Sequence, residues 1–164
     1  MELSSFIKAF PGVDMKLNCG SGDHELEGFV NLDKDNGWLF QMGFKYKDNS
    51  IEAITESHSL MFLTEKEIEQ WVEESYRVLK VGGILRITED YSSFEGSKVY
   101  GGWHGKWLVR TLFGPEFFIE LLSKVGFEVF FNNYYDKETQ FKDNSLMQLY
   151  HGCWPRVFHI EGKK

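Results

Sequence analysis

A chain of 164 residues with 42% hydrophobic and 16% aromatic content can bury a hydrophobic core without disulfide or metal support. Its formal net charge of −7, from 18 Lys and Arg against 25 Asp and Glu, disfavours a nucleic-acid partner, because phosphate binding needs a basic face. We therefore expect one globular domain over residues 1–164.

The sequence carries no signal for a membrane or an oxidising compartment. No apolar run approaches the roughly 20 residues that cross a bilayer, and the N-terminal MELSSFIKAFPGVD lacks the pattern of a secretion signal. Cys19 and Cys153 form no disulfide framework, and the five histidines show no metal-ligand spacing. These features predict a cytoplasmic protein without a metal site or membrane association.

Six short hydrophobic runs, bounded by glycine or polar residues, predict β-strands. In chain order they are MKLNC (15–19), GFVNL (28–32), IEAIT (51–55), ILRIT (84–88), FEVFF (127–131) and RVFHIEG (156–162).

The segment TEKEIEQWVEESYRVLKVGG (64–83) predicts the first clear helix. Thr64 and Glu67 form a capping box at its start, and Gly82 is expected to end it in a left-handed conformation. Its apolar stripe follows helical spacing and consists of Ile68, Trp71, Val72, Tyr76 and Leu79.

A second helix is predicted in GPEFFIELLSKVGF (114–127). Pro115 suits its first turn and Gly126 its end. The residues expected to face the core are Phe117, Phe118, Leu121, Leu122 and Val125.

The order of these elements predicts an α/β fold, with a mainly parallel sheet, helices on both faces and an antiparallel C-terminal hairpin. In such sheets ligands bind outside the carboxyl ends of the strands. The segments of interest are therefore those that follow strands: NCGSG (18–22), Asp33, TESHS (55–59) and TEDYSS (88–93).

The stretch KLNCGSGDHELEGFVNLD (16–33) holds the parts of a nucleoside site. Gly20 and Gly22 let the backbone approach a ligand, and Asp33 can accept hydrogen bonds from a ribose diol. The alternative is a plain turn followed by a solvated aspartate. Only 13 residues separate Gly20 from Asp33, fewer than the roughly 20 expected of a dinucleotide fold, so the stretch alone favours the turn.

Residues 15–164 nevertheless resemble, in five ordered pieces, the class I S-adenosylmethionine-dependent methyltransferases. The branch is the small one with a shortened first helix, of the methyltransferase type 11 kind. KDNSIEAITESHSLMFL is similar to its PFxDNSFDxIxSSHVLEHL, and YRVLKVGGILRI to its RVLKPGGxLRI. The stretch 16–33, GPEFFIELLSKVGF and WPRVFHIEGKK match LNLGCG…GWINVD, FTPExLxxLLxxAGF and RPxSLxVEARK.

The resemblance implies a Rossmann-like domain that binds S-adenosylmethionine. The residues that it assigns to the cofactor fall in four groups. These are the loop around the methionine end (Asn18, Cys19, Gly20 and Ser21), the ribose acid (Asp33), the adenine segment (Gln41 and Met42, up to Gly43) and the strand tip under the methionine (Ser57 and His58).

Several positions depart from the family pattern. Asn18 replaces the first glycine of the turn, where asparagine can adopt left-handed φ, so Asn18→Gly is expected to tighten binding if the turn is merely strained. Gln41 stands near an acid that contacts adenine, Met61 and Phe62 replace a polar pair at the site mouth, and Val81 replaces a proline.

The chemistry implied is in-line methyl transfer, in which positioning of donor and acceptor dominates. A base is needed only for an acceptor that must lose a proton. The candidates at the strand tips are Glu56, His58, Asp90, Tyr91 and His104, and the pattern assigns the catalytic role to none of them. The expected acceptor region is SSFEGSKVYGGWHGKW (92–107), in which Trp103 and Trp107 cover either a substrate or the core.

Two functions remain open. The first is a methyltransferase for a small-molecule or carbohydrate-like acceptor. The second is a degenerate relative that binds a partner chain, a second copy or the cofactor without catalysis, which Asn18 and the Met61–Phe62 pair motivate. A nicotinamide-dependent oxidoreductase is disfavoured because the chain has no second domain for its substrate.

Overall fold

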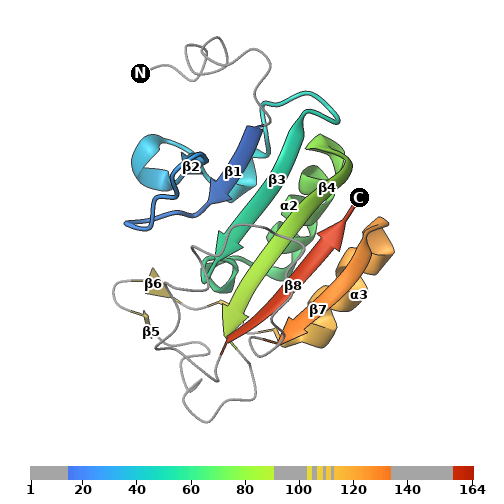
Figure 1. The fold of residues 1–164 in the computed structure, drawn as a ribbon. Helices are drawn as coiled ribbons and strands as arrows, with labels where there is room; N and C mark the ends of the chain where they lie inside the picture. Colours follow the sequence, from blue (N-terminus) through green and yellow to red (C-terminus); the bar gives the residue numbers. More distant parts are fainter. Residues whose placement is uncertain (1–14, 91–102, 105–106, 109, 112, 134–156) are drawn as a thin grey trace.

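One mixed sheet carries the fold. The computed structural model describes residues 15–90, 103–104, 107–108, 110–111, 113–133 and 157–164, and the structural statements below concern these residues. Six strands lie in the order β2-β1-β3-β4-β8-β7 (Figure 1). Their bounds are β1 Met15–Cys19, β2 Val30–Leu32, β3 Ile51–Ser57, β4 Leu79–Asp90, β7 Glu128–Asn133 and β8 Val157–Lys163.

The first four strands of the sheet are parallel and the last two pairings are antiparallel. β1 pairs in parallel with β2 and with β3, and β3 pairs in parallel with β4. β8 runs antiparallel to both β4 and β7. The predicted parallel sheet with an antiparallel C-terminal hairpin is confirmed. Because the chain moves outward from β1 in opposite directions, toward β2 and toward β3, the edge beyond β1 and β3 is a topological switch point.

Both predicted helices are present. α2 spans Glu65–Val78 and begins at the expected capping box of Thr64 and Glu67. α3 spans Pro115–Val125, with Pro115 in its first turn and Gly126 ending it at φ +116°. The expected stop at Gly82 is wrong: α2 ends at Val78, because Leu79 is already extended and begins β4, and Gly82 adopts its positive φ inside that strand.

The two helices lie on the same face of the sheet. They contact one another and are both seen behind the strands in Figure 1. Their buried residues, Trp71 and Phe118 among them, pack on one side of the sheet in a single hydrophobic cluster. No α-helix on the opposite face lies within the described ranges. The link between β1 and β2 also holds no helix, and short 3₁₀ turns follow instead: η1 Lys34–Asn36, η2 Phe40–Met42 and η3 Leu60–Phe62.

The opposite face of the sheet is polar and yet buried. Arg86 on β4 lies directly across from Glu161 on β8, and both side chains are at most 1% exposed. The guanidinium donates to Glu161 Oε1 through Nε at 3.0 Å and through Nη2 at 2.7 Å. One step along the ladder, Thr88 Oγ1 lies 2.9 Å from His159 Nδ1. Burial lowers the pKa of His159 to about 4, with a further contribution from the charge of Arg86.

Some sequence expectations fall outside the described part of the chain. They include the N-terminal residues 1–14, Tyr91 and most of the expected acceptor region. From that region the structure describes the backbone of two short paired strands, β5 Trp103–His104 and β6 Trp107–Leu108. Within the described ranges, no helix combines the length and the apolar character needed to cross a bilayer.

The buried Arg86–Glu161 pair predicts a large stability effect. We expect Glu161→Gln to lower the free energy of unfolding by about 3 kcal/mol, because it leaves a buried guanidinium without its counter-charge. Asp48→Asn is the matched control, since Asp48 pairs with Arg77 at 2.6 Å but is 69% exposed, and should cost less than about 1 kcal/mol. Urea unfolding measures both, and equal losses would contradict the assignment.

Candidate functional site

The glycine turn after β1 folds back onto the end of β2. Gly20 and Gly22 adopt φ +67° and +50°, which favour glycine. The backbone N–H groups of Gly20 and Ser21 both donate to the carbonyl of Leu32, at 2.7 and 3.2 Å. The turn therefore lies beside Asp33, the residue that follows Leu32.

Asp33 is bonded to the turn rather than solvated. The Gly22 N–H donates to its Oδ2 at 3.1 Å, and the Asp35 N–H donates to its Oδ1 at 3.2 Å. Its side chain is 16% exposed. The side chain also accepts the Asn36 N–H in a capping box, and the Lys34 ammonium lies 3.8 Å from Oδ1. A carboxylate offers about four acceptor positions, so these bonds leave capacity for one further donor. The glycine turn and the acid thus fit a ribose diol in this part of the site.

Asn18 does not behave as a substitute for glycine. Its φ is not positive, and its amide is buried in the loop between β1 and β2. Asn18 Nδ2 donates to the carbonyl of His24 at 2.9 Å and to Asn31 Oδ1 at 2.8 Å. Asn31 in turn bonds both the N–H and the carbonyl of Leu26. Asn18 therefore does not adopt the left-handed φ considered for it, and its side chain holds the loop in place.

The side chains of Cys19 and Ser21 are withdrawn from solvent. Cys19 has no exposed surface and lies in the hydrophobic cluster with Trp71. Burial, with the charge of Glu56 as a smaller cause, raises the pKa of the Cys19 thiol, which excludes a thiolate nucleophile. Ser21 is 6% exposed. These two residues can meet a ligand through their backbone.

The tip of β3 carries strained backbone beside the glycine turn. His58 adopts φ +55°, a conformation that non-glycine residues rarely take and that gathers at functional sites. Its N–H donates to the carbonyl of Thr88 at 2.9 Å, and its Nδ1 lies 3.0 Å from Ser57 Oγ. Both predicted residues, Ser57 and His58, are thus held at the end of the parallel sheet.

Two residues that the sequence did not single out meet the glycine turn. A Cβ on Gly20 would lie 2.5 Å from Ser59 Oγ and 3.2 Å from Phe40 Cε2, so only glycine fits there. Gly20, Ser59 and Phe40 therefore join the β1 turn, the β3 tip and η2. Their separation in sequence left no local signal for this contact.

Glu56 precedes this tip and is fully buried. Its Oε1 accepts the Thr88 N–H at 3.1 Å, and its Oε2 accepts Ser59 Oγ at 3.0 Å and the Ser59 N–H at 3.4 Å. Burial raises the pKa of Glu56 to about 7, although these bonds and the charge of His58 act in the opposite direction. A carboxyl without exposed surface cannot reach an acceptor in this conformation.

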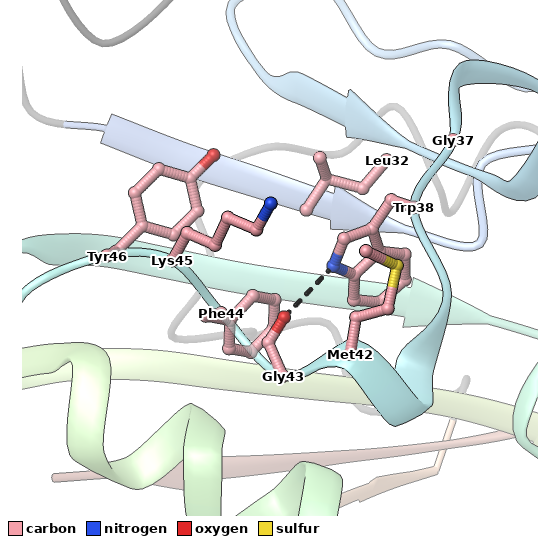
Figure 2. A pocket seen from close by; sticks show the side chains of 8 residues that line it. All are labelled: Leu32, Gly37, Trp38, Met42, Gly43, Phe44, Lys45 and Tyr46. Carbon is pink, nitrogen blue, oxygen red and sulfur yellow. Dashed lines mark hydrogen bonds between the residues drawn. The ribbon is translucent and has the colours of Figure 1, made fainter. Parts of the chain in front are cut away.

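The expected adenine segment lies along η2. Gln41 Nε2 donates to Glu67 Oε1 at 3.0 Å, so its amide is directed to the start of α2. Met42 is 48% exposed and lines a small apolar hollow with Leu32, Trp38 and Gly43. Figure 2 shows this hollow, with the indole Nε1 of Trp38 donating to the Gly43 carbonyl at 3.3 Å.

The mouth of the site differs from expectation. Of the Met61–Phe62 pair that motivated a partner-binding function, Met61 is 7% exposed and Phe62 is partly buried. The carbonyl of Met61 accepts the N–H groups of Arg110 and Thr111, at 2.8 and 3.1 Å. This places the segment after β6 next to η3.

Three base candidates beyond β3 fall outside the described side chains. The side chains of Asp90 and His104, and all of Tyr91, lie outside the described part. The described residues hold no group of three or more His, Cys, Asp or Glu that could bind a metal ion.

The family comparison matches residues 36–87 to a methyltransferase domain family. This segment runs from η1 into β4 and includes the β3 tip. No curated protein matches the chain significantly.

Solved methyltransferase structures share the fold. One from Archaeoglobus fulgidus is 14% identical, with a TM-score of 0.65, and the match covers 99% of this chain and 91% of that one. A possible histamine N-methyltransferase from Thermotoga maritima is 16% identical (TM-score 0.56; 96% and 86% covered). A putative methyltransferase from Haloferax volcanii, in complex with its activator Trm112, is 12% identical (TM-score 0.57; 98% and 76% covered).

The hydrogen bonds of Asn18 predict an effect of Asn18→Gly on stability. We predict a loss of stability of about 1–3 kcal/mol, because the change removes the buried Asn18 amide and leaves the half-buried Asn31 Oδ1 short of a donor. Asn49→Gly is the matched control: Asn49 sits at φ +54°, where glycine is favoured, so the change should cost little. Thermal unfolding compares the two, and a more stable Asn18→Gly protein would refute the fastening role.

Glu56 predicts a pH-dependent stability. Its pKa is raised from 4.5 to about 7, so between these values the folded protein keeps a proton that the unfolded chain releases. The stability from the neutral carboxyl is present below about pH 4.5 and is lost as the pH rises through about 7.

Glu56→Gln removes this titration. Relative to wild type, the variant should gain about 2–3 kcal/mol between pH 5 and pH 8, at about 1.4 kcal/mol per pKa unit. The low pKa of His159 acts with the opposite sign but is shared by both proteins and cancels. Glu73→Gln, on the exposed side of α2, is the control. A constant difference between Glu56→Gln and wild type in denaturant titrations across this range contradicts the prediction.

Proposed function

We propose that this chain, which has the fold of the class I S-adenosylmethionine-dependent methyltransferases, binds S-adenosylmethionine beyond the carboxyl ends of β1 and β3. The methyl acceptor would be a small molecule or a carbohydrate-like compound. The observation that carries the proposal is the bond between the Gly22 N–H and Asp33 at the switch point of the sheet. This bond connects the turn at Gly20 and Gly22, where the backbone can approach a ligand, to Asp33, the acid proposed to bind the ribose diol.

Three parts of the site support the proposal to different degrees. The ribose part is the best defined, because Asp33 is fixed by backbone N–H groups and keeps acceptor capacity. For the methionine end, the turn at Gly20 faces the β3 tip. For adenine, Met42 and Gly43 border an apolar hollow, whereas the amide of Gln41 is engaged by Glu67.

When bound, S-adenosylmethionine would supply a methyl group on a positively charged sulfur. The contribution of the chain is then to hold donor and acceptor in line and to exclude water. The segment at Arg110 and Thr111 is tied to η3, which places the chain after the expected acceptor region near the β3 tip. We assign no catalytic residue.

The alternative is a protein of this fold that binds a partner without catalysis. The Haloferax volcanii neighbour, whose structure contains an activator protein, shows that the fold accepts a partner chain in that case. In this chain Met61 is buried and Phe62 is partly buried, so the Met61–Phe62 pair offers a partner less apolar surface than its sequence suggested. Cofactor binding separates a cofactor-dependent protein from a relative that has lost the site.

We predict that calorimetric titration detects S-adenosylmethionine and S-adenosylhomocysteine at micromolar to sub-millimolar affinity. Asp33→Ala should weaken both about 10- to 100-fold, the usual effect of losing hydrogen bonds to a charged group. Asp35→Ala is the matched control, because the Asp35 side chain is 79% exposed and forms an exposed ion pair with its neighbour Lys34 at 2.7 Å. If the wild type shows neither heat nor a thermal shift at millimolar cofactor, the proposed function fails.

A further inference from the structure

Two neighbouring polar residues of the β3 tip stand where the family pattern has other residues. In the pattern SSHVLEHL the corresponding stretch is ESHSLMFL (56–63), so Glu56 replaces a serine and Ser59 replaces a valine. The two new side chains bond each other, with Ser59 Oγ donating to Glu56 Oε2 at 3.0 Å. The departures therefore form one structural unit.

The buried carboxyl of this Glu56–Ser59 unit lowers the stability of the fold, so its presence calls for a functional explanation. Burying a carboxyl without exposed surface is unfavourable, and the upward pKa shift of Glu56 shows that its bonds do not offset the burial fully. A serine and a valine at these positions would avoid the cost. Ionisable groups that interact with Glu56 include Cys19 from β1 and His58 from the same tip. Glu89 from β4 accepts the N–H of Leu60, the residue after Ser59, through its Oε1.

Ser59 is held at the end of the site where the methionine part is expected. Its Oγ lies against the bare Cα of Gly20, within 2.5 Å of the position of a Cβ. Ser59 is only partly buried, whereas Glu56 is fully buried. Ser59 is therefore the residue of the unit that keeps exposed surface and can meet a ligand.

The bond to Glu56 sets the polarity of that hydroxyl. While an ionised carboxylate accepts the Ser59 proton, the oxygen of Ser59 presents its lone pairs to the site as an acceptor. An acceptor backed by a negative charge suits a cationic donor, and such charge-assisted bonds are the stronger ones. S-adenosylmethionine and S-adenosylhomocysteine both carry an α-ammonium group at the methionine end.

We propose that the Ser59 hydroxyl, oriented by Glu56, accepts a hydrogen bond from the α-ammonium group of the cofactor. Ser59 is then a binding residue and Glu56 a positioning residue that acts through it. The inference rests on the proposed function, because it needs the cofactor at the switch point. The α-ammonium group is then recognised by two residues, Ser59 and Glu56, that differ from the family pattern.

The test compares ligands with and without the amino-acid end. S-adenosylhomocysteine carries it, and 5′-methylthioadenosine lacks it while keeping adenine and ribose. Calorimetry at pH 8, above the pKa of about 7 for Glu56, gives both affinities. Ser59→Ala should weaken S-adenosylhomocysteine about tenfold and change 5′-methylthioadenosine by less than about twofold.

Three further variants separate recognition from structure. Ser59→Thr keeps the hydroxyl and should restore most of the affinity for S-adenosylhomocysteine. Glu56→Gln should reproduce the selective loss, because its amide donates to Ser59 and turns the hydroxyl proton toward the site. Ser50→Ala is the matched control at the other end of β3, where the hydroxyl bonds the Lys47 carbonyl.

Each other outcome has a definite meaning. Equal weakening of both ligands by Ser59→Ala overturns the inference in favour of a structural role. Unchanged affinities in Ser59→Ala, with a wild type that binds, overturn it while leaving the proposed function standing. A selective loss for S-adenosylmethionine but not S-adenosylhomocysteine would point to the sulfonium and overturn the ammonium assignment. A wild type that binds neither nucleoside overturns both proposals.

Discussion

The connection between β1 and β2 imposes the constraint on which the candidate site depends. Parallel neighbours are usually joined by a crossover of a dozen or more residues that contains a helix, but here the link is residues 20–29 and holds none. Its backbone groups need partners that a helix would otherwise supply. Asn18 and Asn31 provide them from the two strands, and the carbonyl of Leu32 receives the two N–H groups at the turn. As a result, Gly22 reaches Asp33 directly.

The sheet separates a hydrophobic cluster on one face from buried polar residues on the other. On the face covered by α2 and α3, residues such as Leu17, Ile54 and Leu85 meet the hydrophobic cluster. The other face places Arg86 across from Glu161 and Thr88 across from His159, all nearly without exposed surface. A buried ion pair is weak evidence for stability, but its strict geometry fixes the pairing register of β4 and β8. The position of the β3 tip relative to β4 is set by the pairing of these two strands, in which the His58 N–H donates to the Thr88 carbonyl and the Thr88 N–H donates to Glu56 Oε1.

Local sequence signals predicted the elements well because each depends on neighbours a few residues apart. The capping box at Thr64, the proline that opens α3 and the glycine that closes it all act through backbone groups within one turn. The error at Gly82 has the same origin. A glycine near the end of a helical pattern usually predicts where the helix ends. Here the helix ends earlier, because Leu79 already pairs with Ile51 as the first residue of β4. A tertiary contact outweighed the local preference.

The order of strands and helices, the α/β class and the resemblance that pointed to Asp33 and the glycine turn could all be predicted from sequence patterns. Which side chains meet became visible in the folded chain alone. Asn18 fastens to Asn31, Ser59 lies on Gly20, and Glu56 bonds Ser59 and Thr88. The physical reason is that periodicity and caps are local, whereas strand register and the facing of side chains arise from pairings between segments far apart in the chain. Asn18 illustrates the difference. Its residue type suggested a strained turn, whereas its hydrogen bond to Asn31, 13 residues away, holds the loop between β1 and β2 in place.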